Sequence, residues 1–495
     1  MAKVYGIDLG TTYSVISTLD DNGMPEVIAN QDEGSDLLAS AVYFQNGADP
    51  VVGEVAKNQK DIEPERVVEF VKRYIGKPNA PTYEFDGVKY DPITISSLIL
   101  KRMKAYADAQ GHDVKNVVIT CPAYFGNEEK AATRQAGIIA GLNVLNIVHE
   151  PTAAALNYCV REFKENRKIM VYDLGGGTFD ITLFDFSVDD SGKALIDVIK
   201  TGGNDRLGGI DWDARMFDYM CQKYAFENGT EVSNMDDELR TTIRAQVEQA
   251  KKDLSTLEKK SYTIKYDGDR TRIELTRKEF EELTQDLVQQ TMDFVHQLLS
   301  DVNFTPDNVD VVLLVGGSTL MPMIKNAVEA LFPGKVRVEQ PNLAVAKGAA
   351  LSAALEWNER LADIQEKVEK GEEITEEDKE VIGATTDAPV TSDTAAQLMI
   401  DVPQQVSTVK DKLTRSLGPA VFVTEDSYMI DNLLFIGDEI PAEAESVYGT
   451  RVENAPEIVV NVYENVSEDR VNKHITPCFD ANGDPQYTDP ELKVK

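Results

Sequence analysis

Two short segments of the sequence combine aspartate, glycine and threonine in an order that suits the binding of phosphate groups. In Gly6-Ile7-Asp8-Leu9-Gly10-Thr11-Thr12 and in Asp173-Leu174-Gly175-Gly176-Gly177-Thr178, Asp-Leu-Gly follows an apolar run and leads to threonine. Glycine lets the main chain approach phosphates without an intervening Cβ, and successive N–H groups then form a concave anion site. The hydroxyl groups of Thr11, Thr12 and Thr178 could add hydrogen bonds. The pair of segments therefore predicts a site for a nucleoside triphosphate.

Three aspartates in or beside these segments could place a divalent cation at the phosphates. Asp8 and Asp173 stand at predicted strand ends, and Asp180 follows Thr178 by two residues. Magnesium dehydrates reluctantly, so these carboxylates would anchor it through its water shell. The alternative is that both segments are ordinary turns that use glycine and aspartate. One segment alone would leave that choice open, whereas the occurrence of two favours the phosphate site.

The elements that must position these residues alternate between strands and helices over the first 357 residues. The apolar, β-branched runs predict strands at Val4–Ile7, Val117–Thr120, Ile169–Tyr172 and Val311–Val315. Longer amphipathic patterns predict helices at Ile95–Ala109, Asn127–Ala140, Thr241–Leu257 and Arg277–Leu299. This alternation is typical of an α/β fold in which helices pack on the faces of sheets. Because the Asp-Leu-Gly segment occurs twice, each time after a strand, we expect two similar lobes.

The overall composition is that of a folded globular protein of two or three domains, with 495 residues and 42% hydrophobic side chains. Its formal net charge of −35 would repel a phosphate backbone, so we expect no nucleic-acid partner. The four cysteines form no Cys-x-x-Cys pair, which suits a reducing compartment better than a disulfide framework or a zinc site. The sequence opens on a predicted core strand and lacks a long apolar run, so we expect no signal peptide, no membrane span and a cytoplasmic location.

The composition changes after Trp357. An acidic stretch from Glu359 to Glu380 predicts a short charged helix, and the Ala-, Thr-, Asp- and Pro-rich stretch from Gly383 to Thr394 predicts a flexible linker. A solvated spacer is the simpler interpretation of this acidic stretch, and a functional acidic motif is the alternative. Strand-like runs at Pro419–Val423 and Ile458–Tyr463 then predict an all-β region. The expected domains are residues 1–357, a linker at 358–402, and a small β-domain at 403–495.

Five segments, in their order along the chain, resemble the signature segments of the seventy-kilodalton heat-shock protein family. They are Gly6–Thr12, Cys121-Pro122-Ala123-Tyr124-Phe125, His149-Glu150-Pro151-Thr152-Ala153-Ala154-Ala155, Asp173–Asp180 and Val315-Gly316-Gly317-Ser318-Thr319. The resemblance implies that residues 1–357 form an actin-like, hexokinase-like ATPase domain. In such a domain two ribonuclease H-like halves face each other across a deep cleft. It also implies ATP or ADP and Mg²⁺ as cofactors, with K⁺ as a further candidate.

The resemblance also implies roles for individual residues at the phosphate end of the cleft. Asp8, Asp173 and Asp180 would hold the metal and its waters, with Asp173 also catalytic, while Gly10, Thr11 and Thr12 would contact the phosphates together with Gly175, Gly176, Gly177 and Thr178. Lys72 matches the family lysine near the γ-phosphate, and Glu150 matches the glutamate that helps to place the attacking water. Phosphoryl transfer has a charge-spread transition state, so positioning and electrostatics do most of the catalytic work. Without the resemblance, Lys72 is an ordinary surface lysine.

At the adenosine end, the resemblance points to one face of a helix and to one loop. Glu248, Lys251, Lys252 and Ser255 are spaced at i, i+3, i+4 and i+7, so they share a helical face that could line the base and ribose. An ordinary charged face is the alternative. Gly316, Gly317 and Ser318 follow the strand Val311–Val315 and would approach the nucleoside closely. Asn342 would lie nearby.

Three positions depart from the family pattern. Leu320 stands where many members have an arginine against the adenine, and Asn342 stands where an aspartate usually follows the proline. Both differences could weaken nucleotide affinity. Lys130 stands where an arginine is common near Pro122, and this difference could alter coupling between domains.

The C-terminal part resembles the family less closely. Leu398-Met399-Ile400-Asp401-Val402 resembles the hydrophobic interdomain linker, and Ser416-Leu417-Gly418 resembles the start of the peptide-binding β-domain. Thirteen residues separate the two, more than the family pattern has. The chain reaches Lys495 with too few strands for a full β-sandwich and with no helical lid. The sequence is therefore expected to be a truncated form, the alternative being a member with a reduced peptide-binding domain.

The resemblance implies an ATP-dependent molecular chaperone that binds unfolded or extended peptide segments and acts as a monomer. It also implies a J-domain co-chaperone and a nucleotide-exchange factor as partners. A small-molecule kinase on the same fold is a second hypothesis, because fold does not fix function, but the sequence offers no separate substrate domain. A nucleotide-gated scaffold without client-folding activity is a third. The presence of Lys72, Glu150 and Thr178 argues against this third hypothesis.

Overall fold

The computed structural model describes most of the chain. It covers residues 3–162, 165–188, 194–338 and 340–381. Beyond these it describes residues 396, 398–400, 402, 406–410, 416–424, 427–435, 438, 444, 462–465, 471–475, 478–479, 485–486 and 493–494. The predicted linker stretch from Gly383 to Thr394 and the first four residues of the predicted strand Ile458–Tyr463 lie outside the described residues.

The first lobe is built on a sheet with the strand order β11-β10-β1-β2-β3, and β4 also pairs with β2. Its strands are β1 (Val4–Asp8), β2 (Tyr13–Leu19), β3 (Pro25–Val27), β4 (Leu38–Ala39), β10 (Asn116–Cys121) and β11 (Asn143–His149). β1 runs parallel to β10 and antiparallel to β2. The side chains of β1 are buried in the lobe's core because both faces of the strand are covered.

The second lobe repeats this arrangement with the strand order β18-β17-β12-β13-β14-β19. Its strands are β12 (Arg167–Leu174), β13 (Phe179–Val188), β14 (Ala194–Asn204), β17 (Val311–Val315), β18 (Val336–Val338) and β19 (Val406–Lys410). β12 pairs antiparallel with β13 and parallel with β17, as β1 does with β2 and β10. The duplicated, actin-like α/β fold that the sequence predicted is therefore confirmed.

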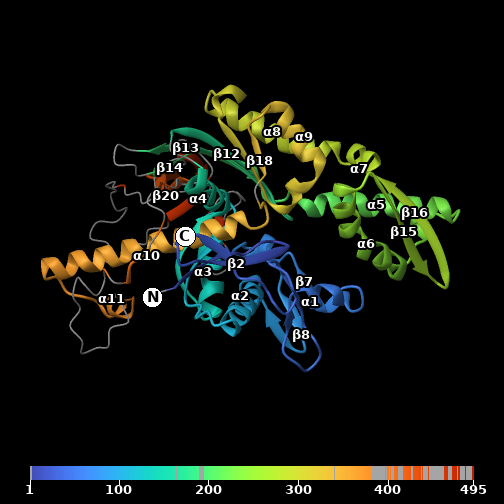
Figure 1. The fold of residues 1–495 in the computed structure, drawn as a ribbon, viewed down its shortest axis with the longest axis horizontal. Coiled ribbons are helices and arrows are strands. Elements are labelled where there is room, and N and C mark those ends of the chain that lie inside the picture. Colours follow the sequence, from blue (N-terminus) through green and yellow to red (C-terminus); the bar gives the residue numbers. More distant parts are fainter. Residues whose placement is uncertain are drawn as a thin grey trace.

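Two helices join the lobes. α4 (Glu150–Glu162) and α10 (Ala344–Lys370) pack against each other between the two sheets (Figure 1). The buried face of α10 is rich in alanine and includes Gly348, which lets the backbones approach closely. A Cβ on Gly348 would meet the carbonyl of Ala153 in α4, and a Cβ on Gly6 would meet the backbone of Ala350. These contacts fix α10 against both halves of the molecule.

Further helices and hairpins complete each lobe. In the first lobe they are β5 (Ala41–Tyr43), β6 (Val51–Val52), α1 (Glu54–Gln59), η1 (Pro64–Arg66), β7 (Val67–Glu69), η2 (Val71–Tyr74), β8 (Tyr83–Phe85), β9 (Val88–Tyr90), α2 (Pro92–Ala109) and α3 (Asn127–Ile139). In the second they are α5 (Gly209–Glu227), η3 (Val232–Asn234), α6 (Asp237–Thr256), β15 (Lys259–Tyr266), β16 (Asp269–Thr276), α7 (Arg277–Leu283), α8 (Gln285–Asp301), η4 (Pro306–Asn308), η5 (Gly317–Leu320) and α9 (Pro322–Leu331). No helix in the described ranges is both long and apolar enough to cross a bilayer.

The strands and helices expected within residues 1–357 are present, with one correction. Beyond them, the predicted short charged helix at Glu359–Glu380 is instead the end of α10 and the separate helix α11 (Glu376–Val381). The predicted single helix Arg277–Leu299 is wrong, because Thr284 separates α7 from α8. Thr284 is fully buried, and its hydroxyl donates to the carbonyl of Phe280 at 2.8 Å. Such side-chain bonds to the backbone compete with regular helix geometry and often bend a helix.

The chain after α10 returns to that helix before it forms a further sheet. A short helix α11 (Glu376–Val381) follows Gly371. The backbone of Ile400 then exchanges two hydrogen bonds of 2.8 Å with the side chain of Asn358, and Trp357 Nε1 donates to the carbonyl of Leu398. The predicted domain limits stay predictions, but Trp357 itself lies inside α10 rather than at its end.

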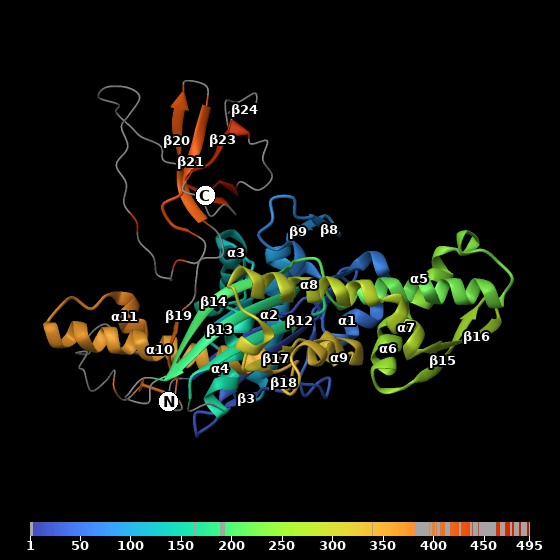
Figure 2. The same cartoon turned by 90° about the horizontal axis from the view of Figure 1, so that it is seen from above.

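The C-terminal strands form a five-stranded sheet with the order β23-β21-β20-β22-β26, beside which β24 pairs with β25. The strands are β20 (Ser416–Thr424), β21 (Ser427–Asp431), β22 (Val462–Asn465), β23 (Val471–Ile475), β24 (Cys478–Phe479), β25 (Pro485–Gln486) and β26 (Lys493–Val494). The sheet stands beside the two-lobed body near α3 (Figure 2). Glu464 makes the contact, accepting a hydrogen bond of 3.2 Å from the backbone N–H of Asn127 at the start of α3.

Candidate functional site

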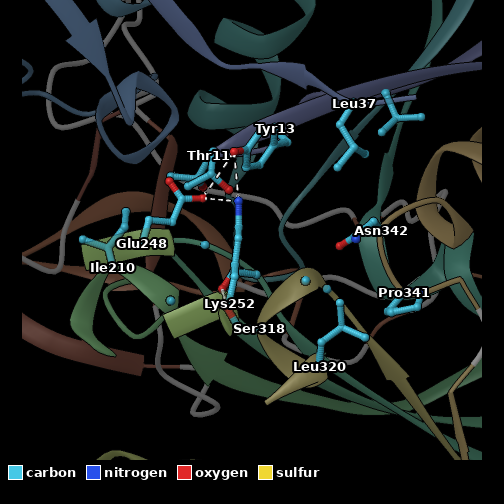
Figure 3. A pocket seen from close by; sticks show the side chains of 18 of the residues that line it. Thr11, Tyr13, Leu37, Ile210, Glu248, Lys252, Ser318, Leu320, Pro341 and Asn342 are labelled. Atoms are coloured by element: carbon cyan, nitrogen blue, oxygen red, sulfur yellow. Dashed lines mark hydrogen bonds and ion pairs between the residues drawn. The ribbon is translucent and has the colours of Figure 1, made fainter. Parts of the chain in front are cut away.

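A cavity of about 750 Å³ opens between the two lobes and is lined by segments from both. The turn after β1 and the turn after β12 reach it from opposite sides, since each follows the equivalent strand of its own sheet. Further walls come from η2, the start of α4, α6 and the loop after β17. Figure 3 shows side chains from the turn after β1, from α6 and from the loop after β17 around one space.

The two glycine–threonine turns meet face to face. A Cβ on Gly177 would lie 2.6 Å from the Cγ2 atom of Thr11, and a Cβ on Gly176 would meet the side chain of Thr12. No larger residue fits at either glycine while the lobes keep this separation. The turns therefore bring main-chain segments from both halves together beside the cavity, where their free N–H groups could form a composite anion site.

Lys72 and Glu150 form a buried ion pair at this end of the cavity. Lys72 lies in η2 of the first lobe and is 5% exposed, and Glu150 begins α4 and is 7% exposed. Burial lowers the pKa of Lys72, but the carboxylates of Glu150 and Asp8 outweigh burial and the net shift is upward. The lysine is therefore held as a cation inside the cavity, contrary to the exposed position that the sequence alone suggested.

Three aspartates surround this pair, and their pKa values are raised. Burial, followed by repulsion from Glu150, raises the pKa of Asp8 to about 7. The same two causes raise the pKa of Asp173 and of Asp180 well above the usual range. Asp180 accepts a hydrogen bond of 3.0 Å from the N–H of Ala123, but its other oxygen is buried without a hydrogen-bond partner. This concentration of buried carboxylates would be relieved by a bound cation.

The carboxylates do not by themselves form a complete metal cage. Across the part of the chain that the structure describes, no three His, Cys, Asp or Glu side chains are grouped closely enough to hold a metal ion. Magnesium usually keeps several waters and takes only one or two protein carboxylates, with phosphates as further ligands. The residues present therefore fit a magnesium ion that arrives with a triphosphate.

At the other end of the cavity, α6 supplies the charged face that the spacing predicted. Glu248, Lys251, Lys252 and Ser255 all line the cavity. Lys251 donates to the carbonyl of Gly209 at 2.9 Å and pairs with Asp213 at 2.7 Å. The Ser255 hydroxyl donates to the carbonyl of Lys251 at 3.0 Å.

Glu248 is the centre of a contact across the cleft that the sequence did not reveal. Its carboxylate pairs with Lys57 of α1 at 2.5 Å and with Lys252 at 2.7 Å, and Tyr13 donates to it at 3.2 Å (Figure 3). Both lysine ammonium groups also lie over the Tyr13 ring. Burial raises the pKa of Glu248, but Lys57 and Lys252 outweigh burial and lower it to about 2. The two lobes are thus joined by an ion pair above the cavity.

The positions that depart from the family pattern are found in two places. Leu320 and Asn342 line the cavity, where Leu320 is 50% exposed and presents an apolar side chain. The Asn342 amide faces the loop after β17, since a Cβ on Gly317 would lie 2.7 Å from its oxygen. Lys130 lies in α3 and is not among the residues that line the cavity.

The structure gathers nearly all the site residues expected from the sequence. Gly177 and Asp180 do not line the cavity but adjoin residues that do, since Gly177 precedes Thr178 and Asp180 pairs with Asp173 in the sheet. The remaining predicted residues line it. Their chemical roles stay predictions.

Sequence reasoning missed Tyr13 and Lys57, which join the two lobes at Glu248. Tyr13 directly follows the first threonine pair, whereas nothing in the sequence signals Lys57.

Comparison with known proteins places the whole two-lobed region in one family. The family model described as "Hsp70 protein" matches residues 4–84 and 79–366. Proteins named "Chaperone protein DnaK" from Thermotoga neapolitana, Thermotoga maritima and Thermosipho melanesiensis are each 40% identical to this chain over 362 residues. The matched region is 71% of this chain and 59% of each relative, so the chain matches less than two thirds of the relatives' length.

Proposed function

This chain belongs to the Hsp70 protein family, and from that membership we propose that it is an ATP-dependent molecular chaperone. It binds Mg·ATP between its lobes, hydrolyses it to ADP and phosphate, and couples this turnover to the binding and release of extended peptide segments. The observation that carries the proposal is the meeting of two glycine–threonine turns, one from each half, around the buried Lys72–Glu150 pair.

In this proposal the turns hold the phosphates. The backbone N–H groups at Thr11–Thr12 and Gly176–Thr178 bind the β- and γ-phosphates, and the three threonine hydroxyls add hydrogen bonds. Asp8 and Asp173, backed by Asp180, would hold a magnesium ion through its waters. When bound, magnesium would neutralise charge on the phosphate oxygens. A potassium ion has no specific support among the described contacts.

Hydrolysis forms a bond between a water oxygen and the γ-phosphorus and breaks the bond from that phosphorus to the bridging oxygen, which leaves with ADP. In this proposal Glu150 accepts a hydrogen bond from the attacking water, and its ion pair with Lys72 supports the assignment because it holds both side chains in the cavity. The Lys72 ammonium would stabilise the negative charge that spreads over the γ-phosphate oxygens. Such preorganised charge stabilises the transition state more than the ground state.

The nucleoside occupies the far end of the cavity, between α6 and the loop after β17. Leu320 there offers an apolar surface to the base, and Asn342 offers an amide. The C-terminal sheet is the proposed site for extended peptide, and residues 398–402 are the proposed link between the two activities. A J-domain co-chaperone and a nucleotide-exchange factor are the proposed partners.

The test is ATP turnover by the 495-residue chain, measured with and without an extended hydrophobic peptide. Calorimetry with Mg·ATP is performed first, and a measurable heat of association is expected. Turnover that rises when peptide is added supports the coupled function. Turnover that the peptide leaves unchanged would remove the chaperone half of the proposal, and the absence of any Mg·ATP binding would remove both halves.

A further inference from the structure

We propose that Arg73 positions the second glycine turn for phosphoryl transfer by holding the carbonyl of Gly177 across the cleft. Arg73 lies in η2 of the first lobe, next to Lys72, whereas Gly177 belongs to the second lobe. Its Nη2 atom donates to the Gly177 oxygen at 2.7 Å, and its Nε atom donates to the same oxygen at 3.2 Å. The inference rests on the proposed ATP hydrolysis and names a residue that acts through the turn rather than on the nucleotide.

All three glycine carbonyls of the turn are held by donors. The Gly175 carbonyl accepts from Gly209 N at 3.0 Å and from the Ser318 hydroxyl at 2.8 Å, and the Gly176 carbonyl accepts from Ile210 N at 2.8 Å. These donors come from the second lobe itself, at the start of α5 and in the loop after β17. The Gly177 carbonyl is held by Arg73, which is contributed by the other lobe.

Because the peptide bond is planar, the hydrogen bond from Arg73 to the Gly177 carbonyl also sets the orientation of the Thr178 N–H group. In a trans peptide the C=O of one residue and the N–H of the next point in opposite directions within one plane. Fixing the Gly177 carbonyl therefore fixes the direction of the Thr178 N–H. Thr178 lines the cavity, whereas Gly177 does not. Arg73 thus orients a phosphate-binding N–H only while the lobes are closed.

The η2 element is packed tightly in the first lobe, and this packing fixes the backbone from which Arg73 extends. Val71 and Ile75 are buried on either side of the two cations. Gly76, which follows, has a φ of 70°, and a Cβ there would lie 2.6 Å from the Cα of Glu129 in α3. One short element therefore presents Lys72 to the cavity and Arg73 to the opposite lobe.

Arg73 also approaches the helix that supplies the other donors. Its Nη2 atom lies 3.5 Å from Asp211, and Asp211 accepts a hydrogen bond of 2.8 Å from Gly208 N at the start of α5. The guanidinium group thus contacts both the Gly177 carbonyl and Asp211, which lies beside the α5 residues that hold the other two carbonyls. A planar group with several donors suits such a double contact better than an ammonium does.

A neighbouring ion pair provides a matched control. Lys77 pairs with Asp205 of the second lobe at 2.6 Å, and the two side chains are 25% and 37% exposed. The Arg73 and Asp211 side chains are 20% and 32% exposed. Both pairs join the lobes near the same place, but Lys77 makes no described contact with the glycine turn. Removing Lys77 therefore weakens the contact between the lobes without changing a hydrogen bond to the glycine turn.

The experiment compares R73M, R73K and K77M in the 495-residue chain. Methionine keeps the apolar stem of arginine and removes its donors. Single-turnover hydrolysis of Mg·ATP and the equilibrium dissociation constant for Mg·ATP are both measured. We expect R73M to slow hydrolysis by about 10- to 100-fold, the range expected for misplacement of a reacting group. Its dissociation constant should change by less than about threefold, the range of a partly exposed ion pair.

The controls separate the possible results. K77M should keep hydrolysis within about threefold of the wild type, and R73K, which has a single donor group, should lie between R73M and the wild type. Equal losses in R73M and K77M would overturn the role of Arg73 and leave only lobe attachment. If R73M melts at a lower temperature than K77M, its slower hydrolysis could come from lost stability, and the R73K variant is then the test. Hydrolysis at the wild-type rate in R73K would overturn the inference. A wild type that binds Mg·ATP without hydrolysing it would overturn the proposed function and the inference with it.

Discussion

At the scale of single residues, the cavity combines one lysine with several carboxylates in a small buried volume. Lys72 balances part of the charge of Glu150 and Asp8, but Asp173 and Asp180 are left with strongly raised pKa values. Full ionisation of these buried carboxylates is therefore unfavourable while Lys72 is the cation that they share. Under the proposed function, a magnesium ion bound with the triphosphate would favour the ionised carboxylates, and Lys72 would face the phosphate.

Replacing Lys72 by alanine tests this residue directly. The variant should bind Mg·ATP but hydrolyse it about 100- to 1,000-fold more slowly, the loss seen when a preorganised charge or donor is removed from a transition state. Calorimetry measures the binding, and phosphate release measures the turnover. Comparable turnover in the variant and the wild type would favour a nucleotide-gated scaffold.

The residues that could be predicted from the sequence are those in repeated or ordered motifs. Asp8 and Thr11 were predicted because the same letters recur at Asp173 and Thr178. Lys57 could not be predicted, since its partner Glu248 lies 191 residues away and only the fold brings them together. Glu248 was predicted to line the nucleoside site, and it does line the cavity, but its ion pairs were not foreseen.

At the scale of elements, α1 and α6 are joined across the cavity by an ion pair. The Lys57–Glu248 pair lies between them, and its side chains are 20% and 31% exposed. Because the pair is partly buried and Tyr13 adds to it, opening the cleft must break several contacts at once. Under the proposed function, nucleotide release would require that opening.

Replacing Lys57 by methionine should therefore speed ADP release. A loss of about 1 kcal/mol, the upper range for such a pair, corresponds to about fivefold faster release. Stopped-flow displacement of a fluorescent ADP analogue measures the rate. Lys60→Met is the control, because Lys60 follows the same helix but pairs with Glu69 inside the first lobe. Equal release rates in both variants would show that the cross-cleft pair does not limit opening.

The elements themselves were largely predictable, and the exceptions have local causes. Strands such as β1 and β17 are continuous apolar runs, because both faces of each are buried. The break at Thr284 was missed because its cause is a side-chain bond to the helix backbone rather than a glycine or proline. The segment at 398–400 was read as a linker, and its hydrogen bonds to α10 depend on Asn358, which carries no sequence signal.

At the scale of the whole molecule, the two lobes depend on the close packing of α10. Gly348, in the second turn of this helix, is less favourable to helix formation than alanine by about 1 kcal/mol. The glycine is required because the carbonyl of Ala153 occupies the space of a Cβ. The glycine thus lowers the helix propensity of α10 but allows its backbone to pack closely against α4.

Gly348→Ala should destabilise the protein, although alanine is the better helix former. Overpacking costs about 1–3 kcal/mol, and the upper end applies because the obstructing atom is a backbone carbonyl oxygen. Subtracting the gain of about 1 kcal/mol in helix propensity leaves an expected net loss of about 2 kcal/mol. Urea denaturation measures the change in the free energy of unfolding. Glu366→Ala, on the exposed part of the same helix, should change it by less than about 0.5 kcal/mol. Increased stability in the glycine variant would contradict the packing described here.

The late position of α10 in the sequence also affects how the chain folds during synthesis. Val4 and Val118 of the first lobe are buried against Ala349, Ala353 and Trp357. These partners are synthesised after the second-lobe strands β12 to β18, so the side of the first sheet that α10 covers stays exposed until Ala349 and the residues after it have emerged. A nascent chain that stops before α10 would expose that apolar surface to aggregation. The two lobes are therefore separate in shape but not independent as folding units.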